Sequence, residues 1–73
     1  PCTTIEFIIP KNGQVKLELY NLLGEKIADI LNEIRSAGNH KIDVNLNHLA
    51  SGVYFYKLSA ADFEATKKML LLR

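Results

Sequence analysis

The sequence predicts an all-β domain, built as a sandwich or barrel of short antiparallel strands. Three observations support this fold class: apolar and polar residues alternate with a period of two, turn-forming residues separate the alternating segments, and the segments are evenly spaced. The expected strands begin 11 to 14 residues apart, near Thr3, Gln14, Glu25, Gly38, Gly52 and Phe63. Even spacing of short strands is typical of small all-β folds.

The first two expected strands each have one apolar face. Ile5, Phe7 and Ile9 share one face of the first strand. In the second strand, the apolar residues alternate with charged ones that we place on the solvated face: Val15, Leu17 and Leu19 against Lys16 and Glu18. Residues 10–13, Pro-Lys-Asn-Gly, are a strong hairpin signal, so we expect a tight turn between these strands.

The third expected strand has a competing interpretation. From Leu19 to Ile34 the apolar residues recur at helical spacing, which favours an amphipathic helix. Asn21 would cap this helix, although Gly24 in its interior would cost roughly 1 kcal/mol relative to alanine. The alternative is a hairpin loop at residues 21–24 followed by a strand over residues 25–32. The pattern of residues alone leaves both open.

The fourth and fifth expected strands differ in their exposure. The fourth alternates with one apolar face, formed by His40, Ile42, Val44 and Leu46. The fifth is apolar on both faces, because Tyr54 and Tyr56 share one face while Val53 and Phe55 lie on the other. A strand of this kind is typically central and buried, so we expect Tyr54 and Tyr56 to be core aromatics. An exposed aromatic platform for sugar is the alternative.

The last expected strand ends in a continuous apolar run over residues 69–72. Either both faces of this strand are covered, or one face is left for a partner. A strand at a chain end is also a plausible sheet edge, where backbone groups can pair with another chain. An open edge of this kind allows a homodimer.

Composition excludes several classes of function. The nine Lys and Arg residues nearly balance eight Asp and Glu, with no long basic run, so we expect no nucleic-acid partner. Cys2 is the only cysteine, which rules out an internal disulfide. No apolar stretch approaches the roughly 20 residues that span a bilayer. The chain is one small domain, and its start at Pro1 indicates a module of a longer protein.

The individual polar candidates point to structural roles rather than to chemistry. We expect His40 to be a partly buried histidine and His48 a solvated turn residue. Cys2 has no neighbouring base to activate it, and Asp43 and Glu64 are isolated acids. Without a catalytic, phosphate-binding or metal-binding motif, we expect no enzyme, no cofactor and no metal. Three glycines are expected to supply turn conformations: Gly24, Gly38 and Gly52.

Several segments, in this order, resemble a known family. They are the first strand to Pro10, the second strand to Tyr20, the Leu-Gly-Glu-Lys-Ile of residues 23–27, the Ala-Gly-Asn-His of residues 37–40, the Leu-Ala-Ser-Gly-Val-Tyr-Phe-Tyr-Lys-Leu of residues 49–58, and the Lys-Lys-Met-Leu-Leu of residues 67–71. Together they resemble the type A C-terminal sorting domain of the type IX (Por) secretion system of Bacteroidetes. The resemblance covers essentially the whole chain.

The resemblance implies an immunoglobulin-like antiparallel β-sandwich of about six to seven short strands, with a hairpin at residues 21–24. It also implies a non-catalytic address on a secreted cargo, recognised by the outer-membrane translocon and usually removed by a sortase. The final strand and chain end would then be the recognition site: Lys67, Lys68, Met69, Leu70, Leu71, Leu72 and Arg73. The alternatives are an immunoglobulin-like module that binds carbohydrate or the cell surface, and a helical dimerisation unit over residues 19–34.

Overall fold

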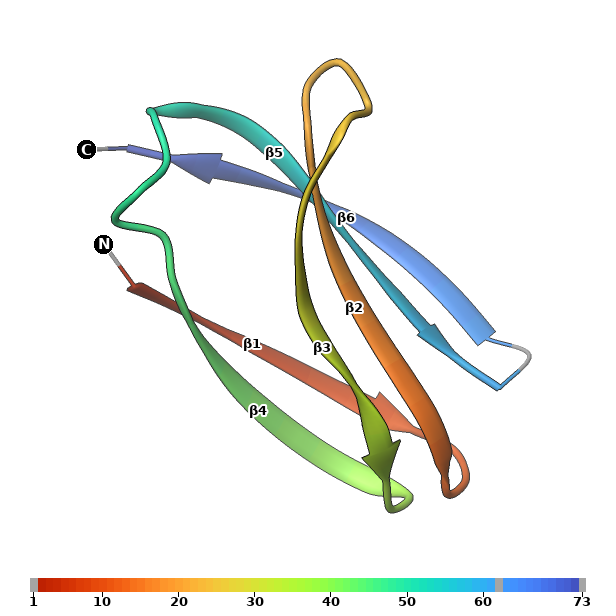
Figure 1. The fold of residues 1–73 in the computed structure, drawn as a ribbon. Coiled ribbons are helices and arrows are strands. Elements are labelled where there is room, and N and C mark those ends of the chain that lie inside the picture. Colours follow the sequence, from red (N-terminus) through yellow and green to blue (C-terminus); the bar gives the residue numbers. More distant parts are fainter. Residues whose placement is uncertain (1, 62, 73) are drawn as a thin grey trace.

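The structure, a computed structural model, describes residues 2–61 and 63–72. These residues form six β-strands and no helix (Figure 1). Each strand begins within one residue of its expected start, so the all-β prediction is confirmed. The strands are β1 (Cys2–Ile9), β2 (Gly13–Asn21), β3 (Lys26–Arg35), β4 (Gly38–Asn45), β5 (Gly52–Ala60) and β6 (Phe63–Leu71).

The six strands form two antiparallel sheets of unequal width. One sheet has two strands in the order β1-β4, and the other has four in the order β3-β2-β5-β6. The two sheets lie in separate layers (Figure 1). Buried apolar residues from both sheets form one core. The predicted antiparallel β-sandwich is therefore confirmed, with six described strands.

Residues 19–34 are not helical, so the helical interpretation of this segment is wrong. The segment contains the end of β2, a turn and most of β3. The side-chain oxygen of Asn21 accepts hydrogen bonds from the backbone N–H groups of Leu23, at 3.0 Å, and Glu25, at 2.9 Å. Asn21 thus stabilises the turn instead of capping a helix, because its short side chain can bond to the backbone just ahead of it.

The hairpin expected at residues 10–13 is also wrong. β1 pairs with β4, whereas β2 pairs with β3 and β5, so this turn carries the chain from one sheet to the other. The β3–β4 connection crosses between the sheets at the same end of the molecule (Figure 1). The Asn12 side-chain oxygen accepts a 2.7 Å hydrogen bond from the backbone N–H of Ala37, which ties the two crossings together.

The centre of the core lies on β2, which is flanked by β3 on one side and β5 on the other. Val15 and Leu17 have no exposed surface, and Leu19 is 2% exposed. From the smaller sheet, Ile5, Phe7 and Ile9 face them. The alternation expected for these two strands therefore defines the core.

Candidate functional site

β6 lies at an edge of the four-stranded sheet. It pairs with β5 over its whole length, from Phe63 opposite Ala60 to Leu71 opposite Gly52. Among the described strands, β5 is its only neighbour, so the second edge of β6 carries free backbone groups. These groups can pair with an added strand.

The apolar run at the end of β6 is split between two faces. Leu71 is buried at 5% exposure and Met69 packs against the core, whereas Leu70 and Leu72 are 63% and 73% exposed. Alternation along a strand places successive side chains on opposite faces, which explains the split. Two large leucines therefore remain on the surface at the end of an open edge strand. Arg73, the last residue of the predicted recognition site, lies outside the described residues.

Lys67 and Lys68 point to opposite faces of β6. Lys67 is paired in register with Tyr56 and lines a groove between the two sheets, while Lys68 is paired with Phe55 on the outer face. Both lysines are exposed. The predicted recognition residues therefore form one continuous segment of chain but do not form one surface.

Tyr54 and Tyr56 both face the interior of the sandwich. Tyr54 is 8% exposed, and its hydroxyl donates a 2.7 Å hydrogen bond to the carbonyl oxygen of Ala50. Tyr56 is half-buried, packs against the core and lines the groove. Together these rings do not form the exposed platform that the carbohydrate-binding alternative requires.

The three predicted turn glycines all have positive φ: 84° at Gly24, 125° at Gly38 and 155° at Gly52. The requirement is strongest at Gly24 and Gly38, because each begins or ends a reversal of the chain. A side chain at either position would meet no neighbouring atom within 4 Å. The constraint on these two positions is therefore conformational and not steric crowding.

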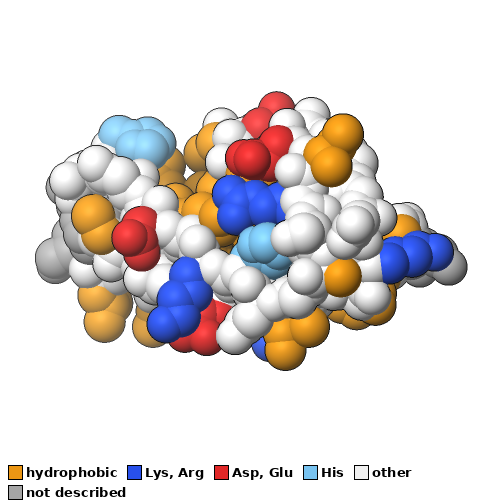
Figure 2. Space-filling model, turned by 90° about the horizontal axis from the view of Figure 1, so that it is seen from below, with side chains coloured by type: hydrophobic (Ala, Val, Ile, Leu, Met, Phe, Trp, Pro, Cys, Tyr) orange, Lys and Arg blue, Asp and Glu red, His pale blue; other side chains and the backbone are white. Residues whose placement is uncertain are grey.

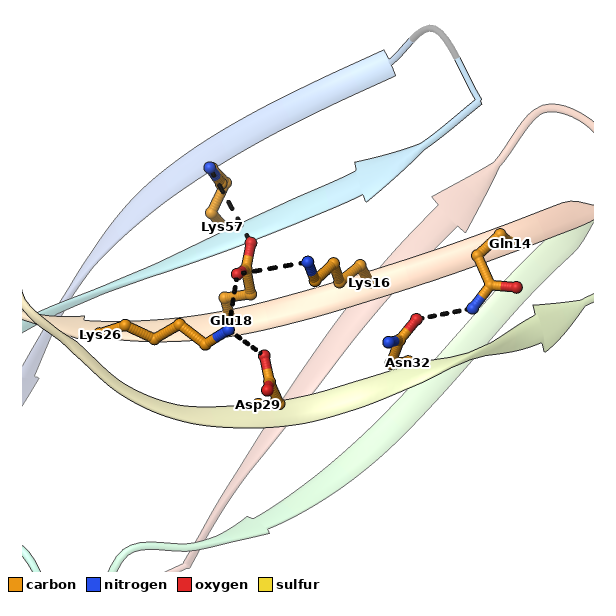
Figure 3. A network of polar contacts seen from close by, with 7 residues as sticks. All are labelled: Gln14, Lys16, Glu18, Lys26, Asp29, Asn32 and Lys57. Carbon is orange, nitrogen blue, oxygen red and sulfur yellow. Dashed lines mark hydrogen bonds and ion pairs between the residues drawn. The ribbon is translucent and has the colours of Figure 1, made fainter.

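Glu18, expected on the solvated face of β2, is buried at 6% exposure. Lys26 lies 3.2 Å from its carboxylate, Lys16 lies 3.7 Å away and Lys57 lies 3.9 Å away (Figure 3). Lys26 also contacts Asp29 at 2.7 Å. The three lysines come from three adjacent strands and together they cover one carboxylate.

These contacts determine the ionisation of the cluster. Burial alone would raise the pKa of Glu18, but the hydrogen bond from Lys26 and the charges of the three lysines outweigh burial and lower this pKa. The hydrogen bonds of Lys26 to Asp29 and Glu18 raise the pKa of Lys26. Sequence reasoning missed the cluster, because only the register of β2 with β3 and β5 brings Lys26 and Lys57 to Glu18.

His40 is a half-buried structural residue. One ring nitrogen lies 2.7 Å from the Ser36 carbonyl oxygen and donates to it; the other lies 3.3 Å from an Arg35 guanidinium nitrogen and accepts from it. The ring also stacks on Phe7, with centroids 5.4 Å apart. His40 thereby fixes the β3–β4 crossing, which gives a physical reason for the Ala-Gly-Asn-His turn.

The remaining polar candidates lie apart. Cys2 and His48 are exposed, Glu64 is exposed on β6, and Asp43 accepts a 2.7 Å hydrogen bond from the Thr4 hydroxyl. Within the described residues, no three His, Cys, Asp or Glu side chains come together as a metal site. Over the same part of the chain, no helix could cross a membrane. On the face in Figure 2, acidic and basic side chains are interspersed, with hydrophobic patches between them.

Fold and site together define a small β-sandwich module whose distinctive surface is an open, apolar edge strand at the chain end. Over residues 2–72 the sequence matches the family described as the secretion system C-terminal sorting domain, and the chain belongs to this family. Its role is therefore that of a type IX secretion signal, which implies a secreted or cell-surface cargo and interaction with the secretion machinery. No curated protein and no solved structure matches the chain.

Proposed function

We propose that this domain is a non-catalytic address at the C-terminus of a larger secreted protein, and that the type IX outer-membrane translocon recognises it through β6 and the chain end. The cargo would precede the domain and reach the outer membrane through the periplasm. A sortase would then remove the address, and the cargo would be attached to the cell surface.

One observation carries this proposal: Leu70 and Leu72 are exposed at the end of an edge strand. Two large apolar side chains at 63% and 73% exposure contribute little to the domain's own core. Leu70 belongs to β6, which has β5 as its only described neighbour, and Leu72 directly follows the end of that strand. An added strand would therefore gain main-chain hydrogen bonds from the edge and selectivity from the two leucines.

The test is export of a fluorescent reporter fused ahead of residues 1–73 in a type IX-competent bacterium. Removal of the whole chain end would be ambiguous, because Leu71 is buried and its loss would destabilise the fold. The informative variant replaces only the exposed pair, as Leu70→Ser with Leu72→Ser. We expect the reporter to reach the surface or medium with the native domain and to remain in the periplasm with this variant.

The matched control is Leu22→Ser with Leu23→Ser in the β2–β3 turn. These leucines are 67% and 83% exposed, so the change in surface polarity is comparable while β6 is untouched. Export by the control together with retention of the β6 variant supports the proposal. Export by both variants would show that the exposed leucines are not the recognition site.

A further inference from the structure

The two sheets of the sandwich do not match in width, and a groove results. β1 has β4 as its only described neighbour, while the opposite sheet continues past β1 to β6. The groove of about 360 Å³ lies between β1 and the inner faces of β5 and β6. Its apolar lining includes Ile5, Phe7, Leu58, Phe63 and Ala65, and Lys67 lies at its wall.

The edge of β1 along this groove lacks the features that usually block strand addition. β1 runs through eight consecutive register pairs with β4 without a bulge, and the strand contains no proline or lysine and one charged residue, Glu6. In the larger sheet, the outer strand β3 has two register shifts in its pairing with β2, whereas β6, like β1, pairs without a register shift and differs from β1 in carrying Lys67 and Lys68. Bulges, prolines and lysines are common protections of sheet edges. The β1 edge is therefore open to pairing.

The space beside β1 suits a single strand better than a second copy of the domain. The side chains of Phe63, Ala65 and Lys67 on β6 form the floor beside β1. A symmetric copy that paired its own β1 here would bring its own four-stranded sheet into the space that β6 occupies. A lone extended segment has no such sheet beneath it, so it can pair with β1 without meeting β6.

The lining also indicates the chemistry of the occupant. Side chains of an added strand would point alternately into the groove and away from it, so those facing Leu58 and Ala65 should be apolar. Two charged residues line the groove: Glu6 on β1, which lies 3.9 Å from Lys41, and Lys67, which has no ion-pair partner among the described residues. An acidic side chain near Lys67 would therefore be stabilised by opposite charge.

We propose that this groove binds an extended segment of a partner polypeptide. The segment adds as a strand to β1, places alternate apolar side chains over Leu58 and Ala65, and carries an acidic residue toward Lys67. This site uses the edge of β1 and the interior face of the larger sheet, whereas the sorting proposal uses the free edge of β6 and its exposed leucines. Either proposal can fail without the other.

The test is binding of a labelled synthetic peptide to the 73-residue protein, followed by fluorescence anisotropy. The probe has the length of β1, eight residues, and alternates valine, facing the groove, with threonine, and one groove-facing valine is replaced by glutamate. A second probe carries lysine in place of the glutamate. We expect saturable binding, tighter for the glutamate probe, and slower hydrogen exchange at the backbone amides of β1.

Two pairs of variants locate the site. Ala65→Phe fills the groove and should weaken binding about tenfold or more, while Thr66→Phe, one residue along on the outer face, should not. Lys67→Glu should reverse the preference between the two probes, while Lys68→Glu should leave it unchanged. Circular dichroism and the thermal midpoint of each variant show that the fold is retained.

Several results would overturn the proposal. One is the absence of saturable binding, and another is equal binding by Ala65→Phe and the native protein. Protection of β6 amides in place of β1 amides would assign the peptide to the other edge. A dimer in sedimentation that protects β1 would make a second copy the occupant.

Discussion

β2 and β6 are nine-residue strands of the same sheet, yet their environments are opposite. β2 has strands on both sides and buries four residues, including Leu17 and Glu18 on opposite faces, whereas β6 has one described neighbour and buries only Leu71. The end of β6 and the residue after it nevertheless form a continuous apolar run over residues 69–72. Apolar content therefore does not measure burial: position in the sheet decides whether a leucine supports the fold or remains available to a partner.

The largest expected effect comes from truncating equivalent leucines on the two strands. Leu17→Ala should lower the free energy of unfolding by about 2–5 kcal/mol, because Leu17 is fully buried between the sheets. Leu70→Ala should change it by less than about 0.5 kcal/mol, because Leu70 is 63% exposed. Chemical denaturation of both variants measures the difference. Equal losses would show that the exposed leucine supports the fold after all.

The next effect separates the two faces of β6 itself. Leu71→Ala should cost about 2 kcal/mol, the lower end for a buried leucine, because only β5 flanks this strand. Leu72→Ala, next along the chain and 73% exposed, is the matched control and should be nearly neutral. Thermal unfolding of the two variants provides the measurement. A neutral Leu71→Ala would mean that the end of β6 does not pack on the core.

The smallest effect concerns the acidic residues on the two strands. The pKa of Glu18 is lower in the folded protein than in the unfolded chain, so its ionised carboxylate raises the free energy of unfolding at pH values above the unfolded pKa of about 4.3. This stabilisation is lost as the pH falls through the folded pKa of Glu18. The pKa of Lys26 is raised in the folded protein, so this lysine stabilises the fold at pH values below its unfolded pKa of about 10.4. That stabilisation is lost as the pH rises through the folded pKa of Lys26.

Glu18→Gln should therefore lower stability near neutral pH by up to about 1 kcal/mol and flatten the loss of stability on acidification. Glu64→Gln, at an exposed position on β6, should leave both unchanged. Unfolding free energies measured between pH 7 and pH 2 compare the two variants. If Glu18→Gln lost unfolding free energy on acidification as steeply as the native protein does, the lysine cluster would not stabilise the carboxylate.

Much of the fold follows from local pattern. The alternation of Ile5, Phe7 and Ile9, and of Val15, Leu17 and Leu19, identified buried faces that the structure confirms. Local pattern did not decide between a helix and a hairpin over residues 19–34, because the apolar positions of this segment fit both. The Asn21 side chain, bonded to the backbone of the turn, shows how local hydrogen bonding favours the hairpin there.

The candidate site was predictable as a segment of chain and not as a surface. The residues of the final strand were identified from the apolar run, but their division into buried Leu71 and exposed Leu70 and Leu72 depends on which face of β6 meets the core. The same dependence separates Lys67, in the groove, from Lys68 on the outer face. Nothing in the spacing of these residues distinguishes one face from the other.

The sequence by itself determined where the strands begin, which faces are apolar and which family the chain resembles, because periodicity and turn residues act over a few neighbouring positions. Tertiary structure alone decided that residues 10–13 cross between sheets, that Glu18 is buried beneath lysines from three strands, and that β1 and β6 border a groove. These features depend on pairing between strands that lie far apart in the chain, and pairing is set by how the two sheets close over their shared core.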